Sequence, residues 1–192
     1  GGRGIYYTQG DDPTPIKDYS QAIFTVLKNK VNEYKLNMPK IYIEPGRSII
    51  GPCGSNLYSV GSIKDIPGIR KYVAVDGGMS DNIRPALYGA KYEVGIGNRM
   101  NANSNTEVIT ISGKLCESGD ILARDIELPI IESGDTLIMT STGAYGYSMA
   151  SNYNMIGKPA VVLVKDGKSD LIIKRQSYDD LMTNHIFLER LK

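Results

Sequence analysis

The feature of this chain that most limits its fold is a change in the pattern of apolar residues near Leu57. Between Thr14 and Leu36, apolar residues recur at helical spacing, and the short apolar run Ile41–Ile43 follows. Beyond Leu57, short runs rich in β-branched and aromatic residues alternate with glycine-containing turns. The pattern predicts a helix-and-strand segment over residues 1–56 and a β-domain over residues 57–192.

The first segment has the pattern of half a βαβ unit. Thr14 is predicted to cap the helix, Pro15 suits its first position, and one face of the helix is expected to be buried. The run Ile41–Ile43 is predicted to be a buried strand that ends at a turn, Glu44-Pro45-Gly46-Arg47. Because Gly1-Gly2-Arg3-Gly4 is typical of a loop that follows a strand, we expect the chain to begin inside a domain.

The second segment is predicted to be mainly β-structure. A closing helix is expected from Ser177, where Tyr178, Leu181 and Met182 have helix-like spacing. A hairpin is expected through the sequence KDGKSD, which joins the last two predicted strands. The predicted strands are Ile69–Asp76, Glu107–Ile111, Thr136–Thr140, Val161–Lys165 and Leu171–Arg175.

Composition excludes several classes of function. The net charge is +1 and the basic residues are scattered, which argues against a nucleic-acid or acidic-membrane partner. No apolar run approaches the about 20 residues that span a bilayer, and the N-terminus lacks a signal-peptide pattern, so we expect a cytoplasmic protein. Cys53 and Cys116 lack metal-ligand spacing, so we expect reduced thiols and no bound metal.

Two motifs of the first segment have both a functional and a structural interpretation. The glycines of GGRG could let backbone N–H groups approach a phosphate, or could form a flexible turn. In EPGR, Glu44 and Arg47 follow a predicted strand, where α/β folds place their chemistry, but they could also form a surface ion pair.

Three later motifs are equally open when taken singly. The long polar loop over residues 76–90 carries Arg84 and Tyr88, which could bind a carboxylate; alternatively, Arg84 could cap local carbonyls. Cys116 beside Glu117 could supply a general acid and a recognition carboxylate, or could pack in the core. Tyr145 could reach a phosphate or be a core residue.

The order of the motifs is more specific than any one of them. GGRGI, EPGR, DGGMSDNIRPALYGA, LCESGD, GAY and SNYN occur in an order and spacing that resemble the fold-type III pyridoxal-phosphate-dependent decarboxylases over nearly the whole chain. Within that family, DNIRPALYGA and CESGD are most similar to the loops of the diaminopimelate decarboxylases, whereas ornithine and arginine decarboxylases have Asp after the Cys.

The resemblance implies a fold and an assembly. Residues 1–56 would be the last βα unit of a (β/α)₈ TIM-type barrel, and residues 57–192 a mostly antiparallel β-domain of barrel or sandwich type. The family forms homodimers with active sites at the interface. The implied reaction converts meso-diaminopimelate to L-lysine and CO₂ with pyridoxal 5′-phosphate as cofactor.

The resemblance also implies residue roles. Around the cofactor phosphate it places Gly1, Gly2, Gly46, Arg47 and Tyr145, with Glu44 at the pyridinium nitrogen. It implies that Arg47, Arg84 and Tyr88 hold the distal carboxylate of the amino-acid substrate. Tyr145 is implied to bind the substrate as well as the cofactor. Glu117 would bind the distal ammonium and Cys116 would be the general acid, both acting in the partner's site.

The chain departs from the family in two respects. Two glycines precede Arg3 where the family has three, and the Schiff-base lysine lies in an N-terminal half that has no counterpart here. We therefore expect no decarboxylase activity from this chain alone. Two alternatives stay open: a decarboxylase of arginine, ornithine or carboxynorspermidine, and a non-catalytic β-domain that binds a partner decarboxylase. Cys116 and Glu44 argue against the second alternative, since a binding module needs neither.

Overall fold

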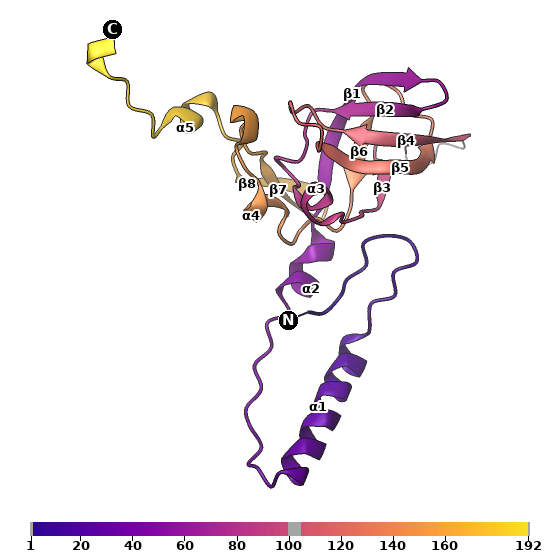
Figure 1. Cartoon of the computed structure of the whole chain (residues 1–192), viewed down its shortest axis with the longest axis vertical. Coiled ribbons are helices and arrows are strands. Elements are labelled where there is room, and N and C mark those ends of the chain that lie inside the picture. The colour runs from indigo at the N-terminus through magenta and orange to yellow at the C-terminus, as the bar shows by residue number, and fades with distance from the viewer. Residues whose placement is uncertain (1, 100–104, 192) are drawn as a thin grey trace.

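The computed structural model describes residues 2–99 and 105–191. Figure 1 shows helix α1 (Ile16–Glu33) on two long connections, away from a curved sheet that holds the middle of the chain. Short helices α2 (Gly46–Ile50) and η1 (Gly51–Cys53) lead into the sheet. After the sheet come α4 (Gly146–Met149), η2 (Tyr153–Met155), the hairpin β7 (Val161–Lys165) and β8 (Lys168–Ile173), α5 (Tyr178–Met182) and η3 (Glu189–Leu191).

The main sheet is six-stranded among the described residues, with strand order β3-β6-β1-β2-β4-β5. Its strands are β1 (Asn56–Ile66), β2 (Arg70–Val75), β3 (Val94–Ile96), β4 (Thr106–Ser112), β5 (Ile121–Pro129) and β6 (Thr136–Met139), with α3 (Arg84–Tyr88) between β2 and β3. Every neighbouring pair is antiparallel except β2 and β4, which confirms a mostly antiparallel domain.

One face of this sheet forms the hydrophobic core. Side chains alternate between the two faces of a strand, so residues two apart, such as Ile109 and Ile111 of β4, enter the core together. They meet Val73 of β2 and Leu137 of β6, each at most 1% exposed. The core positions the loops after β2, β4 and β6, which carry the later motifs.

The predicted strands of the β-domain are confirmed at β2, β4, β6 and β7. β8 begins at Lys168, before the predicted Leu171, because Asp166 and Gly167 complete the turn with φ of 50° and 72°. Sequence reasoning missed β1, β3 and β5. The closing helix is confirmed: Ser177 caps α5 and shares a capping box with Asp180.

Four predictions for residues 14–47 were wrong in detail. Thr14 does not cap α1, whose N-cap is Pro15. Only Val31 of that helix is buried, and Phe24 is 50% exposed, so the expected buried face is open among the described residues. Ile41–Ile43 forms no strand, because the described chain offers no neighbouring strand to share its backbone hydrogen bonds. The last two residues of the expected turn at 44–47, Gly46 and Arg47, are instead the first residues of α2.

A close backbone contact joins α2 and η1 to the loop after β6. The N–H of Thr142 donates to the carbonyl of Gly54 at 2.9 Å, and the N–H of Gly143 donates to that of Gly51 at 3.0 Å. A Cβ on Gly143 would lie 2.1 Å from the Ile50 carbonyl oxygen, and a Cβ on Gly54 would lie 2.4 Å from the Cα of Gly143. Glycine at both positions is therefore what lets the two backbones touch.

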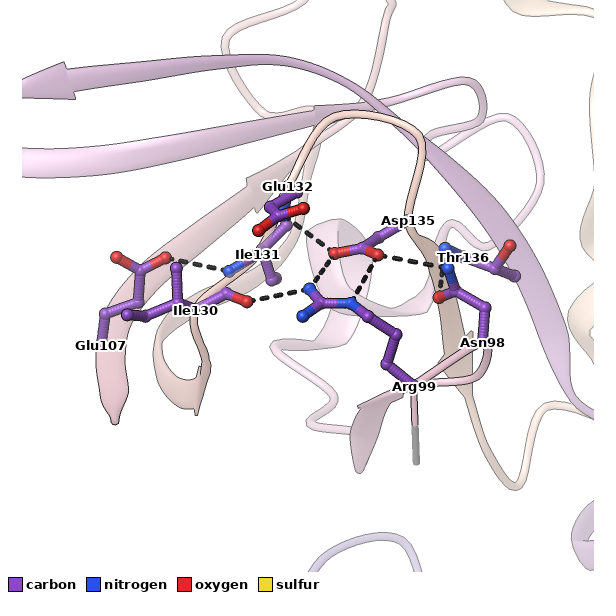
Figure 2. Close-up of polar contacts among 8 residues, drawn as sticks. All are labelled: Asn98, Arg99, Glu107, Ile130, Ile131, Glu132, Asp135 and Thr136. Atoms are coloured by element: carbon purple, nitrogen blue, oxygen red, sulfur yellow. Dashed lines mark hydrogen bonds and ion pairs between the residues drawn. The ribbon is translucent and has the colours of Figure 1, made fainter. Parts of the chain in front are cut away.

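A buried carboxylate organises the turn between β5 and β6 (Figure 2). Asp135, 4% exposed, accepts hydrogen bonds from the Glu132 N–H at 2.8 Å and the Asn98 amide at 3.2 Å. Arg99 pairs with both of its oxygens and also donates to the Ile130 carbonyl at 3.0 Å. These contacts join the end of β3 to the turn. The Arg99 guanidinium lowers the pKa of the Asp135 carboxyl from 3.8 to about 2.

We expect Asp135→Asn to destabilise the fold by about 1–3 kcal/mol at neutral pH, because Arg99 loses its charged partner. The folded-state pKa of about 2 lies below the ordinary value of 3.8, so ionised Asp135 stabilises the fold above that value. This contribution is lost as the pH falls toward 2, so the difference between the variant and the parent should shrink over that range. Urea unfolding at several pH values measures it, with exposed Asp65→Asn as the control. A difference independent of pH would contradict the assignment.

A second prediction concerns the glycine contact. Gly143→Ala should destabilise the fold by about 1–3 kcal/mol, because the added methyl must displace backbone rather than a flexible side chain. Gly146→Ala is the matched control in the same loop: its Cβ would meet only Thr142, at 3.9 Å, and alanine favours the helix that Gly146 begins. Thermal unfolding compares the two variants. Equal melting temperatures would show that the backbones need no close approach.

Candidate active site

A small polar hollow lies where the N-terminal loop, the start of α2 and the loop before α4 meet. It is lined by Gly2, Arg3, Glu44, Pro45, Arg47, Ser48 and Tyr145. The Arg47 guanidinium donates to the Arg3 carbonyl at 3.3 Å, which fixes the first loop against α2. The sequence-predicted residues Gly2, Glu44, Arg47 and Tyr145 are thus brought together, and Gly46 begins the same helix as Arg47. Gly1 lies outside the described residues.

The chemistry of this hollow suits an anion. Arg3 and Arg47 bring two guanidinium groups, and Tyr145 adds a phenol. The Nε of Arg3 is buried and has no hydrogen-bond partner among the described residues. A buried donor without a partner is costly, and a phosphate oxygen would satisfy it. Gly2 has a φ of 86°, and a Cβ built on it would meet no atom within 4 Å, so the loop leaves room beside the arginines.

Arg84 lies next to the hollow and is held by tyrosines. Its Nε donates to the Tyr92 hydroxyl at 2.8 Å, and its guanidinium carbon lies 5.4 Å from the Tyr88 ring centre and 5.3 Å from that of Tyr145. Burial raises the pKa of Tyr92, so this phenol stays neutral. Among the described residues, ring faces and one hydrogen bond therefore orient the guanidinium, and its other donors could bind a carboxylate.

Tyr145 connects the two groups. It lines the hollow beside Arg47 and also faces Arg84, at a φ of 69° that non-glycine residues seldom adopt. The glycine contact two residues earlier fixes this loop against η1. An anion in the hollow and a carboxylate at Arg84 would consequently share one tyrosine.

Cys116 and Glu117 lie on a different loop, which a buried carboxylate supports. Asp120, 3% exposed, accepts the N–H of Leu115 at 2.8 Å and the N–H of Met79 at 2.6 Å, so it connects this loop to the one after β2. Cys116 is exposed, which contradicts the interpretation of this thiol as core packing. Hydrogen bonds lower the pKa of Glu117: the one from the Gly119 N–H has the largest effect, and the one from the Tyr153 hydroxyl the next largest.

The side-chain hydrogen bonds of Cys116 and Glu117 to other loops lead to residues 153–154, and among the described residues none of them reaches the hollow. Sequence reasoning did not assign roles to Arg3, Tyr92, Tyr153 or Asn154. Arg3 stands inside GGRG, and Tyr153 and Asn154 stand inside SNYN, so the motifs themselves were a signal. Tyr92 had none, because only the folded chain shows its contact with Arg84.

No helix in the described part of the chain combines the length and apolar character needed to cross a membrane. Over the same residues no cluster of three or more His, Cys, Asp or Glu side chains could hold a metal ion.

The chain is similar to known decarboxylases. Residues 19–143 match the family model of the pyridoxal-dependent decarboxylase C-terminal sheet domain. Diaminopimelate decarboxylase of Bacillus subtilis is 51% identical over 182 residues, which cover 95% of this chain and 41% of that protein. The enzyme of the same name from Synechocystis is 46% identical over 100% of this chain and 40% of its own length. The chain thus spans about 40% of the length of the relatives it matches.

Solved structures agree with the sequence matches. The crystal structure of diaminopimelate decarboxylase from M. jannaschii superposes with a TM-score of 0.90 at 39% identity, over 98% of this chain and 42% of that one. A structure of lysine/ornithine decarboxylase from Vibrio vulnificus superposes less well, with a TM-score of 0.66 at 25% identity, over 80% of this chain and 39% of that one. The matched sheet domain covers more than half of the chain, and the chain therefore belongs to the pyridoxal-dependent decarboxylase family.

Proposed function

We propose that this chain is part of a pyridoxal-phosphate-dependent decarboxylase that converts meso-diaminopimelate to L-lysine and CO₂. The observation that carries the proposal is the position of Tyr145, shared between a hollow with two arginines and the guanidinium of Arg84. One anion site suits a cofactor phosphate, and the other suits a second carboxylate on the substrate. The relatives of about 50% identity named diaminopimelate decarboxylase support this assignment.

The residues of the hollow fit the cofactor. We assign Arg3, Arg47, Tyr145 and the backbone of Gly2 and Gly46 to the phosphate, and Glu44 to the ring nitrogen, where a carboxylate favours the protonated form. When bound, pyridoxal phosphate supplies an electron sink for the carbanion left by loss of the α-carboxylate. The residues of this chain that line the hollow would hold and orient that group.

Substrate choice falls to the distal end of the amino acid. Arg84, with Tyr88 and Arg47, would bind the distal carboxylate, and a substrate without one would leave a guanidinium unpaired. Glu117, whose pKa is lowered by hydrogen bonds, would be ionised and suited to the distal ammonium. Ornithine, which lacks a distal carboxylate, should therefore be a poor substrate.

Proton delivery is assigned to Cys116. Its thiol is exposed beside Glu117 and could protonate the α-carbon after CO₂ departs. Because the contacts of this loop do not reach the hollow within the described chain, we propose that it completes the site of a second copy in a homodimer.

The domain assignment is part of the same proposal. Residues 1–56 would belong to a (β/α)₈ barrel and residues 57–192 to the β-domain. In support, α1 and the segment 41–43 present apolar side chains, including Phe24, Ile41 and Ile43, around a shallow hollow that further barrel units would cover. Two exposed free cysteines fit a reducing compartment, so we propose that the enzyme acts in the cytoplasm.

The proposal is tested in the protein at its full native length, with pyridoxal phosphate and a panel of diaminopimelate, ornithine, arginine and lysine. Diaminopimelate should give CO₂ and lysine, and the other substrates far less product. Arg84→Lys should lower kcat/KM for diaminopimelate by an amount equivalent to about 1.5–3 kcal/mol, because lysine cannot make the planar two-donor contact. Preference for ornithine in the parent, or an unchanged kcat/KM in the variant, would overturn the assignment.

Cys116→Ala isolates the proton donor. We expect lysine formation to fall by roughly 10²–10⁴-fold while cofactor binding, followed by absorbance, is retained. Cys53→Ala is the matched control, since it removes the other exposed thiol. Lysine formation at the parent rate by the Cys116 variant would show that this thiol is not the acid.

A further inference from the structure

The SNYN motif, residues 151–154, has no role in the site described so far, yet it touches the loop that carries Cys116. Asn154 Oδ1 accepts the backbone N–H of Cys116 at 3.0 Å. The Tyr153 hydroxyl donates to Glu117 Oε2 at 3.2 Å. Two consecutive residues thus contact the two consecutive residues assigned to chemistry, from a segment more than 30 positions along the chain.

The backbone of this segment has an uncommon conformation. Asn154 has φ 53° and ψ 26°, and Met155 has φ 57°, both in the left-handed region. Non-glycine residues persist in this region only where surrounding contacts hold them. Asparagine tolerates this region better than most residues, and here its side chain also reaches the Cys116 N–H.

The contacts that hold this segment come from residues that follow it in the sequence, at positions 156–158 and 176. The Asn152 amide donates to the Ile156 carbonyl at 2.9 Å and to Gln176 Oε1 at 2.6 Å. Gln176 also accepts the Lys158 N–H at 2.8 Å. A Cβ on Gly157 would lie 2.8 Å from the Gln176 carbonyl, so the chain is closely packed there. The segment is therefore a fixed support rather than a loose loop.

The Cys116 loop has its other support in Asp120. That carboxylate accepts the Leu115 N–H from the buried side, directly before Cys116. Beyond Glu117, the Gly119 N–H donates to Glu117 Oε1 at 3.1 Å, which leaves Oε2 to Tyr153. Asp120 holds the base of the loop, and residues 153 and 154 contact its exposed tip.

We propose that Asn154 and Tyr153 are positioning residues of the decarboxylase: Asn154 fixes the backbone that carries the Cys116 thiol, and Tyr153 orients the Glu117 carboxylate. The inference rests on the proposed function for the roles of Cys116 and Glu117. The two residues then have different effects on the reaction. Asn154 acts on proton delivery, and Tyr153 acts on recognition of the distal ammonium.

The first test uses Asn154→Gly. Glycine keeps the left-handed backbone without strain but removes the acceptor. The Cys116 amide should exchange with deuterium about 5- to 10-fold faster, the equilibrium worth of one hydrogen bond, while the melting temperature does not fall. In the full-length enzyme kcat should fall more than KM changes.

Two variants accompany this test. Asn154→Asp retains an oxygen acceptor and should restore slow exchange at Cys116. Asp166→Gly also replaces a residue of positive φ, here 50°, by glycine, but in the β7–β8 turn. This control should leave the exchange of the Cys116 amide and kcat unchanged. Parent-like exchange and kcat in Asn154→Gly would overturn the role of Asn154.

The second test uses Tyr153→Phe, which removes only the hydroxyl. The pKa of Glu117, followed by carboxyl NMR, should rise, because one of the hydrogen bonds that lower it is gone. KM for diaminopimelate should rise with little change in kcat, the reverse of Asn154→Gly. An unchanged Glu117 pKa and an unchanged KM would overturn the role of Tyr153.

Different measurements test the proposed function and the positioning roles of Asn154 and Tyr153. If the full-length parent releases no CO₂ from diaminopimelate, the proposed function is wrong. Amide exchange at Cys116 and the Glu117 titration need no substrate, so they still decide whether residues 153 and 154 hold this loop.

Discussion

The candidate site depends on one close backbone contact, in which Gly143 lies against Ile50 and Gly54. Two backbone hydrogen bonds run across it, and side chains larger than hydrogen would prevent them. The contact joins the helix that begins at Gly46 to the loop that carries Tyr145. Arg47 and Tyr145, almost a hundred positions apart, line one hollow as a result. The close approach depends on the absence of side-chain atoms at Gly143 and Gly54, because a closely packed interior leaves no room for them.

Buried carboxylates stabilise the loops that the sheet presents. Asp120 connects the loops after β2 and β4 by accepting backbone N–H groups from both, and Asp135 with Arg99 closes the turn between β5 and β6. Both are at least 95% buried, where a carboxylate persists only with such partners. Loops that carry chemistry need fixed geometry without regular secondary structure, and charge-assisted hydrogen bonds provide it.

The two ends of the chain differ from the sheet in how much apolar surface they leave open. Phe24 and Val26 of α1 are 50% and 61% exposed, and Val164 of β7 is 71% exposed, whereas the sheet core is almost fully covered. Apolar surface of this extent is typical of regions that pack on other parts of a protein. This pattern supports the proposal that the chain acts within a larger enzyme. The chain also spans only about 40% of the length of the relatives it matches, which supports the same proposal.

The sequence by itself determined the family, the mainly β character of residues 57–192 and several of its strands, because motif order and short β-branched and aromatic runs bounded by turns are local properties. It also pointed to Arg47, Arg84 and Tyr145 through their motifs. Only the tertiary structure decided that Ile41–Ile43 is not a strand, because a strand needs a neighbour to share its hydrogen bonds. Likewise, only the fold brings Tyr92 to Arg84 and Asn154 to Cys116. These pairs depend on long-range contacts, and neither residue carries a local pattern that indicates its partner.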